Sequence, residues 1–586
     1  MGGDTLHAQF YLEESPSSFV LKAANGSPSQ ALIVDRKTGD VSTKSVPAEP
    51  LQGEKVYGVV GMIKLIAGTY VIVITNRELV ATLRGQPVYQ ITGTRILQCS
   101  SSSDQLSSSQ KHDEEVYLTL LRHALAAPGL YFSPQGDITL NQQSFATLDK
   151  EDLAKPEYER AEPRFFWNRY LVEPLIKKRL DPFIIPIMQG SVQTLKAQGI
   201  KNKALDLTLI ARRSSDRIGT RMWRRGADKA GNVANFVETE QLVLTANHVA
   251  SYIQVRGSIP IFWDQVVDLK WKPKIRTVET STSMSVAKQH FEKLSKAYGG
   301  IVAVDLVNQK GGEAVLGSAY KKEMAVISET NAAVSYWPFD FHKECGRMHF
   351  EKVNILWAKI RDAVEGEHKY FLARDNGEVL QLQKGVVRTN CIDCLDRTNV
   401  FQSVLARKAL EAQLFRLGVF SESEIVAAHP TFDVQYKILW ADHGDAISLQ
   451  YAGTGALKGD FVRYGTRSFR GLLQDGVNAL TRYYYNNFTD GHRQDALDLV
   501  TGHYTVTDDS PPLRGGNLTV WTPLVLTGLI ATATLAIWNA TRGITNLNVQ
   551  YFAWAFLYIG FAYFTFSFIK RHGQQLCDRP RLCNLR

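Results

Sequence analysis

The sequence has little cysteine, no leader-like apolar run at its start, and no compact carboxylate cluster. Six cysteines in 586 residues are too few for a disulfide scaffold of the kind that small secreted domains use. Residues 1–18 include three acidic residues and no apolar stretch of leader length, so we expect no cleavable signal peptide. The missing carboxylate cluster argues against a two-metal site, and we expect neither metal nor cofactor in the chemistry.

The sequence does contain enough apolar and aromatic side chains for large folded cores. Hydrophobic residues make up 44% of the chain and aromatic residues 10%, as in globular rather than disordered proteins. At about 150 residues per domain, this length allows several units. The formal net charge of +9 suits an anionic partner, but charge alone does not choose between nucleic acid and a phospholipid surface.

One segment concentrates residues suited to phosphoryl transfer, namely Arg388-Thr-Asn-Cys-Ile-Asp-Cys-Leu-Asp-Arg-Thr-Asn399. Within it, five residues separate Cys391 from Arg397, and Thr398 follows the arginine. Residues 378–387 alternate in polarity like a strand, and leucines and valines recur at helical spacing after residue 399. The sequence therefore predicts that Cys391 lies in a strand-to-helix loop, with Arg397 at or near the helix start.

This placement favours a thiolate nucleophile on Cys391. Free N–H groups at a helix start, the positive end of the helix dipole and a nearby guanidinium all lower the pKa of a thiol. The same amides can cradle phosphate oxygens, and the planar fork of Arg397 matches two of them. We therefore predict a phosphocysteine intermediate on Cys391 that is later hydrolysed, with Thr398 hydrogen-bonding the departing sulfur.

The spacing of one cysteine and one arginine leaves other interpretations open. Cys391 and Cys394 also form a Cys-x-x-Cys pair, which is typical of a redox couple or of half a zinc site. Zinc needs two further ligands, and Cys99 and Cys345 each stand alone in the sequence. A structural loop and a redox pair remain as alternatives. In a phosphatase, a Cys391–Cys394 disulfide would shield the nucleophile from irreversible oxidation.

The complete string is more specific than the spacing, and it resembles the signature of the Sac-domain (suppressor of actin) phosphoinositide phosphatases. The resemblance extends over roughly residues 51–503. It includes Phe165-Phe-Trp-Asn-Arg-Tyr-Leu171, Ala211-Arg-Arg-Ser, Arg221-Met-Trp-Arg-Arg-Gly226, Phe236-Val-Glu-Thr-Glu240 and Arg256-Gly-Ser-Ile-Pro260. With two apolar segments at its end, the chain is similar to the membrane-anchored member of the endoplasmic reticulum and Golgi.

The resemblance implies hydrolysis of a phosphate from the inositol ring of a phosphoinositide. The expected substrate is chiefly phosphatidylinositol 4-phosphate, with other monophosphates accepted, and nucleic acid is not an expected partner. The expected catalytic residues are Cys391, Arg397, Asp393, Asp396 and Thr398. The expected substrate-binding residues are Asn390, Ile392, Cys394, Leu395, Arg212, Arg213, Arg221 and Arg256.

Six arginines between residues 212 and 225 form a concentrated basic stretch. One interpretation is a solvated face with ion pairs, in which single arginines contribute little. The other is a rim that recruits an anionic headgroup, because basic residues near such a surface contribute about 1 kcal/mol each. The position of this stretch beside Cys391 is implied by the family resemblance alone.

The leaving oxygen needs a proton, and three aspartates are candidates for supplying it. Trp337-Pro-Phe-Asp-Phe-His342 superficially resembles the mobile Trp-Pro-Asp loop of other cysteine phosphatases, which makes Asp340 one candidate. Asp393 and Asp396, inside the cysteine loop, are the others. We expect Asp393 to be essential in a role that the sequence does not fix, and Asp340 and His342 to act as acid or as loop support.

The pattern along the chain predicts an α+β or α/β protein of several units. Residues 1–50 are expected to form an extended lead-in with a few strands, and residues 51–180 a β-rich N-terminal domain. This domain packs on an α/β catalytic domain, residues 181–505, which resembles the cysteine phosphatases. Within it, residues 301–306 suggest a buried strand. Residues 506–519, rich in Pro and Gly, are the expected linker.

The end of the chain predicts a transmembrane hairpin. Residues 520–538 and 551–569 contain no charged residue, and about 20 such residues span a bilayer core. The basic tail, residues 570–586, places the C-terminus in the cytosol, so two spans leave the catalytic domain there too, where Cys391 stays reduced. A re-entrant first segment is the alternative.

These features together predict a two-span protein of the endoplasmic reticulum and Golgi membrane. The linker, residues 506–519, reaches at most about 45–50 Å, which favours action on lipid in the protein's own bilayer. Two rival functions remain open. One is a protein-tyrosine or dual-specificity phosphatase that shares the thiol chemistry, and the other is a catalytically silent phosphoinositide-binding tether. The sequence identifies no protein partner.

Overall fold

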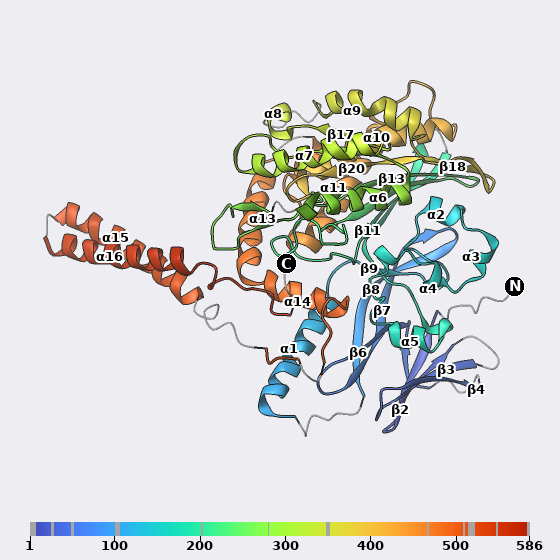
Figure 1. The fold of residues 1–586 in the computed structure, drawn as a ribbon, viewed down its shortest axis with the longest axis horizontal. Helices are drawn as coiled ribbons and strands as arrows, with labels where there is room; N and C mark the ends of the chain where they lie inside the picture. Colours follow the sequence, from blue (N-terminus) through green and yellow to red (C-terminus); the bar gives the residue numbers. More distant parts are fainter. Residues whose placement is uncertain are drawn as a thin grey trace.

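Two β-sheets organise the protein, and a pair of long helices projects from them in the computed structural model (Figure 1). The larger sheet carries helices on both faces, and the smaller sheet lies at the N-terminal end. The structure describes residues 8–24, 29–47, 52–99, 106–200, 203–278, 281–346, 352–465, 468–507, 510–513, 522–546 and 549–582.

The smaller sheet occupies most of the segment predicted as an extended lead-in. Its five strands are antiparallel neighbours in the order β4-β3-β2-β1-β5. Alternate side chains such as Phe19 and Leu21 are buried on one face, where they pack against residues of the larger sheet. The strands are β1 (Phe10–Glu14), β2 (Ser18–Ala23), β3 (Ser29–Asp35), β4 (Val41–Val46) and β5 (Glu54–Val56).

The larger sheet of thirteen strands runs without interruption across the boundary predicted between residues 180 and 181. β9 (Leu130–Phe132) pairs with β8 (Gln86–Gln98) on one side and β10 (Met188–Ile200) on the other. The two predicted domains therefore share one sheet instead of packing as separate units. Its other strands are β6 (Val59–Lys64), β7 (Thr69–Leu83), β11 (Lys203–Arg213), β12 (Val237–Leu244), β13 (His248–Arg256), β16 (Gly300–Asp305), β17 (Val334–Pro338), β18 (Leu372–Asp375), β19 (Glu378–Gln381) and β20 (Gly385–Asn390).

The strand expected over residues 378–387 is in fact two strands, β19 and β20, that lie apart in the sheet. Between them, the side-chain amide of Gln383 pairs with the backbone of Ile253, accepting from its N–H at 2.9 Å and donating to its carbonyl at 2.8 Å. The buried Gln383 side chain thus bonds to β13 as the backbone of a neighbouring strand would. The chain then re-enters the sheet as β20, parallel to β13 and β16.

Helices cover both faces of the parallel strands, and the residues of β16 point alternately to the two sides, as a period of two requires. Val302 and Val304 face the core under α9 (Val353–Arg361), α10 (Asp396–Arg416) and α11 (Pro430–Ala452). Ile301 and Ala303 face the opposite core, under α6 (Ser281–Tyr298) and α7 (Ala314–Thr330). The prediction of a buried strand here is confirmed, because parallel strands covered on both faces are apolar throughout.

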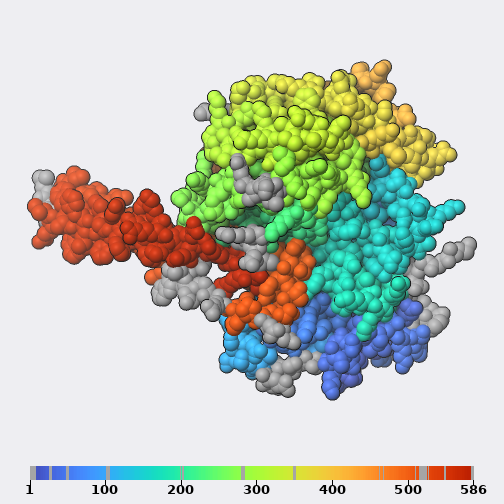
Figure 2. Space-filling model, viewed as in Figure 1, coloured from blue at the N-terminus to red at the C-terminus, as the bar shows by residue number. Residues whose placement is uncertain are grey.

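The last helices form a hairpin that extends away from the body (Figures 1 and 2). It consists of α15 (Thr522–Asn546) and α16 (Val549–His572), which cover most of the two predicted spans. Among the helices that the structure describes, α16 is the one that is long and apolar enough to cross a membrane by length and composition. Most of the predicted linker lies outside the described residues, as do residues 520–521 and 583–586.

Three further helices lie between the hairpin and the sheets: α1 (Ser108–Leu125), α13 (Phe469–Phe488) and α14 (Asp490–Val500). α14 packs against α1, and apolar residues from both enter a core with β6 and β7. After α16, residues 573–582 return to the body and lie against α13 and α14. Residues 573–582 are therefore part of the folded unit.

Asn168 connects two parts of the larger sheet that are distant in sequence. Its buried amide donates to the carbonyls of Val60 at 2.8 Å and Ile185 at 3.1 Å, and its oxygen accepts from the N–H of Ile187 at 2.8 Å. We expect Asn168→Ala to destabilise the protein by about 3 kcal/mol, because it leaves three buried backbone groups without partners. Thermal denaturation in detergent measures this. Arg169→Ala, at an exposed ion pair, should change little, and equal losses in both variants would contradict the role of Asn168.

Candidate active site

The predicted strand–loop–helix is present: residues 391–395 connect β20 to α10 at the carboxyl end of the parallel strands. The loop turns at Cys394, whose φ of 53° is left-handed and rare for a residue with a side chain. That turn points the Cys394 N–H at the Cys391 sulfur, 3.0 Å away. The Thr398 hydroxyl, from the first turn of α10, lies 3.4 Å from the same sulfur. Donors thus surround Cys391 Sγ on the side of the helix start.

These surroundings favour the thiolate form of Cys391. Burial opposes ionisation, but the hydrogen bond from the Cys394 side chain, the positive charge of Arg397 and the Thr398 hydroxyl together lower the pKa of Cys391 to about 6. The pKa of Cys394 moves in the opposite direction, because that thiol is buried beside the Cys391 sulfur. Of the two thiols, Cys391 is therefore the one poised to act as a nucleophile, and Cys394 is the one that keeps its proton.

The guanidinium of Arg397 is not free to bind a phosphate group, because it forms a bidentate ion pair with the Glu313 carboxylate. Both contacts are 3.0 Å long, and a further guanidinium N–H donates to the carbonyl of Leu306 at 3.2 Å. Glu313 ends the short turn before α7, beside the carboxyl end of β16. Binding of phosphate oxygens by Arg397 would require it to give up this carboxylate.

Asp393 is held by two arginines from the same basic stretch. Arg221 approaches one carboxylate oxygen at 2.7 Å, and Arg225 approaches the other at 2.8 Å. Burial opposes ionisation here, but the two guanidinium charges outweigh it and hold the pKa of Asp393 far below its usual value. A carboxylate fixed in its ionised form is a poor proton donor. Asp393 therefore anchors the loop.

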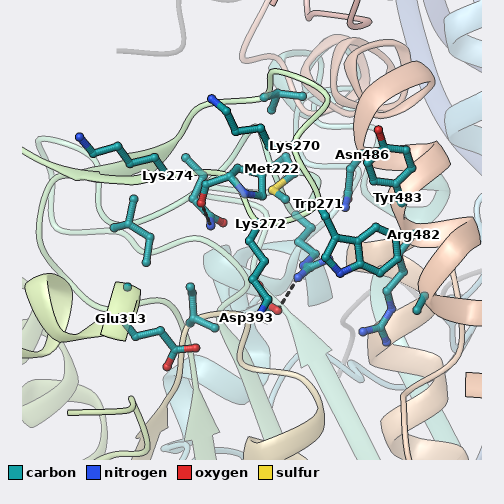
Figure 3. A pocket seen from close by; sticks show the side chains of 18 of the residues that line it. Met222, Lys270, Trp271, Lys272, Lys274, Glu313, Asp393, Arg482, Tyr483 and Asn486 are labelled. Atoms are coloured by element: carbon teal, nitrogen blue, oxygen red, sulfur yellow. Dashed lines mark hydrogen bonds and ion pairs between the residues drawn. The ribbon is translucent and has the colours of Figure 1, made fainter. Parts of the chain in front are cut away.

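A cavity of about 800 Å³ opens above this loop (Figure 3). Its floor includes Ile392, Asp393, Asp396 and Arg397, whereas Cys391 is buried beneath them and does not line the cavity. One wall is the connection between two short strands, β14 (Trp263–Gln265) and β15 (Ile275–Thr277), and the adjoining wall is α13. Basic residues on the walls are Lys270, Lys272, Lys274, Lys310, Arg221 and Arg482. The cavity therefore suits an anionic ligand.

Other arginines predicted at the site are buried away from the cavity. Arg212 is 1% exposed and pairs with Glu238 at 3.1 Å and Glu240 at 2.7 Å on the neighbouring strand. Arg213 bonds the carbonyl of Gly219 at 2.5 Å. These two residues form an internal network instead of the expected rim, because β11 passes through the middle of the sheet. Arg256, also buried, lies under the cysteine loop and donates to Asn399 at 3.3 Å.

Two predicted loop residues face away from the cavity. Asn390 donates to Asp305 at 2.6 Å and accepts from Arg388 at 2.7 Å, so its side chain connects β20 to β16. Leu395 packs in a core with Tyr451 of α11. Both side chains are buried, and neither lines the cavity.

The Trp-Pro-Phe-Asp motif supports a neighbouring loop. Asp340 caps α8 (Phe341–Cys345) by accepting from the N–H of Lys343 at 3.0 Å, and it also accepts from the N–H of Gln309 at 3.0 Å. Gln309 follows Asn308, which contacts Arg397 at 3.2 Å. His342 is exposed. Of the two expected roles, loop support agrees with the contacts of Asp340.

Two functional features escaped the sequence analysis. Glu313 is far from Arg397 in the sequence, and Gly-Gly-Glu carries no local signal for such a pairing. The Lys270-Trp-Lys-Pro-Lys274 segment was overlooked, although lysines on alternate residues around an exposed tryptophan were a visible signal. Within the residues that the structure describes, His, Cys, Asp and Glu side chains form no group of three that could hold a metal ion.

Comparison with known proteins gives a consistent result. The SacI homology domain matches residues 57–346, a range that ends before the cysteine loop. The chain is 44% identical to "Phosphoinositide phosphatase SAC6" of Arabidopsis thaliana over 98% of each protein. It is 34% identical to "Phosphatidylinositol-3-phosphatase SAC1" of Saccharomyces cerevisiae over 98% of this chain and 93% of that protein. The identity to "Phosphatidylinositol-3-phosphatase SAC1-A" of Danio rerio is 39%, over 87% of each.

The lowered pKa of Cys391 predicts a pH dependence. The thiolate predominates above about pH 6 and is lost as the pH falls through that value. The ultraviolet absorbance of the thiolate, taken as wild type minus Cys391→Ser, should titrate with a midpoint near 6. Thr398→Val should move the midpoint upward, because it removes a hydrogen bond to the sulfur. A midpoint near the ordinary thiol value of about 8.5 would show that the site does not activate the sulfur.

The ion pair of Arg397 predicts an effect of Glu313→Gln. Removing the carboxylate eliminates the competitor for the guanidinium, so inorganic phosphate should inhibit the variant more strongly. Loss of the partly exposed Arg397–Glu313 ion pair should change the free energy of phosphate binding by about 1 kcal/mol, which is roughly fivefold in the affinity for phosphate. Competitive inhibition by phosphate measures this, with Glu292→Gln on exposed α6 as the matched control. Weaker inhibition of Glu313→Gln would instead show that Glu313 helps Arg397 to bind phosphate.

Proposed function

The chain belongs to the Sac family of phosphoinositide phosphatases, and on that basis we propose that it hydrolyses monophosphates on the inositol ring of membrane phosphoinositides. The observation that carries this proposal is the Cys391 thiol, whose pKa is lowered to about 6 beneath a basic cavity. The resemblance favours phosphatidylinositol 4-phosphate as the chief substrate. The names of the yeast and zebrafish relatives refer to the 3-phosphate, so the preferred ring position is the first property to measure.

The reaction proceeds in two steps on one sulfur. The Cys391 thiolate attacks phosphorus, and the bond between phosphorus and the inositol oxygen breaks as that oxygen gains a proton. Water then attacks the phosphocysteine, which releases inorganic phosphate and restores the thiolate. Arg397 and the loop amides stabilise the charge on the equatorial oxygens in both steps. Thr398, 3.4 Å from the sulfur, assists its departure.

The cysteine loop must rearrange before this chemistry. Cys391 is buried under the floor of the cavity, and Arg397 is bound to Glu313. Entry of a phosphate group supplies a better partner for the arginine, and the loop moves on the side of Arg397 so that the sulfur becomes accessible. Asp393 serves as the fixed point of this movement, because Arg221 and Arg225 grip its carboxylate. Asp396, at the start of α10 and on the cavity floor, is the remaining loop carboxylate that can exchange a proton with the leaving oxygen.

The helical hairpin is proposed as the membrane anchor. α16 supports this directly by its length and composition, and α15 packs beside it. Two spans would return the chain to the cytosolic side, where the body lies. From the family resemblance, the proposed location is the endoplasmic reticulum and Golgi membrane.

Phosphate release from a panel of phosphoinositide vesicles tests the function. Cys391→Ser should abolish turnover, because serine lacks an ionised nucleophile, whereas Cys99→Ala, at a buried cysteine outside the cavity, should retain it. The panel includes each ring monophosphate and a phosphotyrosine peptide. Turnover of the peptide alone would indicate a protein-tyrosine phosphatase. Binding without turnover, and with no trapped phosphocysteine, would indicate a tether.

A further inference from the structure

Residues 573–582, which we call the C-terminal strap, connect the end of α16 to the body beside the cavity (Figure 1). The strap is well packed: Leu576, Cys577 and Leu582 are buried. Asp578 donates its N–H to the carbonyl of Asn487 at 2.7 Å, and its carboxylate accepts the N–H of His492 at 2.8 Å. The strap therefore crosses the junction of α13 and α14.

The far end of the strap is held as firmly as its middle. The carboxylate of Asp495 on α14 accepts the N–H groups of Arg581 at 2.9 Å and Leu582 at 3.0 Å. The Leu582 side chain enters the core shared by α1 and α14. Gly491 allows this close approach, because a Cβ there would lie 2.6 Å from backbone atoms of Arg579.

The near end of the strap supports the wall of the cavity. Cys577 packs in a small cluster with Met222 and Val267, both of which line the cavity. The backbone of Gly573 lies so close to Asp268 that a Cβ would be 2.6 Å from its carbonyl oxygen. On the other side, the Tyr483 hydroxyl of α13 donates to the carbonyl of Leu269 at 2.8 Å. Residues 267–269, which begin the loop between β14 and β15, are thus held between the strap and α13.

That loop carries groups that suit a phospholipid surface. Lys270, Lys272 and Lys274 are exposed around Trp271, which is 56% exposed and stacks on Tyr483 at 5.4 Å between ring centroids (Figure 3). Tryptophan favours the membrane interface, and lysine favours anionic headgroups. The strap begins one residue after α16 ends, so the basic loop adjoins the end of the proposed membrane helix.

We propose that the C-terminal strap holds the basic loop, residues 267–274, against the bilayer that contains α16, so that the cavity faces lipid in its own membrane. This inference rests on the proposed function and deepens it, because it assigns action in cis to a defined segment. The strap positions the loop and takes no part in the chemistry. Its loss should therefore affect access to bilayer lipid but not the reactivity of Cys391.

Cys577→Arg tests the proposal in the full-length protein reconstituted in liposomes, because it places a charge against Met222 and Val267 and expels the strap. KM for phosphatidylinositol 4-phosphate in the same liposome should rise about tenfold, as the effective concentration of lipid at the cavity falls. Turnover of soluble para-nitrophenyl phosphate should be unchanged. Gln575→Arg adds the same charge at an exposed position of the strap and should behave like wild type.

Parallel loss of both activities in Cys577→Arg would mean general damage and would overturn the proposal, as would an unchanged KM. Asp578→Ala removes one strap contact without adding a charge, and it should raise KM in the same direction if Cys577→Arg fails to fold. Quenching of Trp271 by bromine-labelled lipid, taken as the difference from Trp271→Phe, should fall in both strap variants. This signal needs no turnover, so it tests the strap even if the proposed phosphatase activity fails.

Discussion

The site depends on one constraint, which is the pair of ion pairs that Arg221 and Arg225 form with Asp393. The buried guanidinium of Arg225 and the partly exposed guanidinium of Arg221 together compensate the charge of one loop carboxylate, and removing that carboxylate would leave Arg225 with an uncompensated charge inside the protein. Arg225 also donates to the carbonyl of Ile392 at 2.9 Å, and the backbone of Arg221 bonds Tyr451 of α11. The loop is therefore fixed on one side, and its freedom to move is confined to the side of Arg397 and Glu313.

The buried charge network explains why so many arginines occur in one short stretch. Arg212 lies opposite Glu238 in the pairing of β11 with β12, and Arg224 reaches Asp498 of α14 at 2.8 Å. The first pair joins two central strands, and the second connects the arginine-rich stretch to a helix near the end of the chain. The stretch thus connects parts of the fold that are distant in sequence. Arg221 is the one predicted substrate-binding arginine that lines the cavity, together with Arg397, which was predicted as catalytic.

Local features were predictable from the sequence, and long-range ones were not. The strand, loop and helix around Cys391 follow from residues within one short segment, as does the buried strand β16. The side-chain bridge at Gln383, the pairing of Arg397 with Glu313 and the burial of Arg212 depend on register and on contacts between remote elements. The continuation of the sheet across residue 180 was unpredictable for the same reason, because alternating polarity reports that strands exist but not which strands pair.

The unbroken sheet has a consequence for dividing this protein into fragments. β9 pairs with β10 at Met188 and Gln189, so cutting before β10 would expose the backbone groups at the start of that strand, which invites pairing with another copy. A fragment that begins at the catalytic half would therefore tend to self-associate. Recombinant versions that retain β6 to β9 keep that edge covered and should remain dispersed.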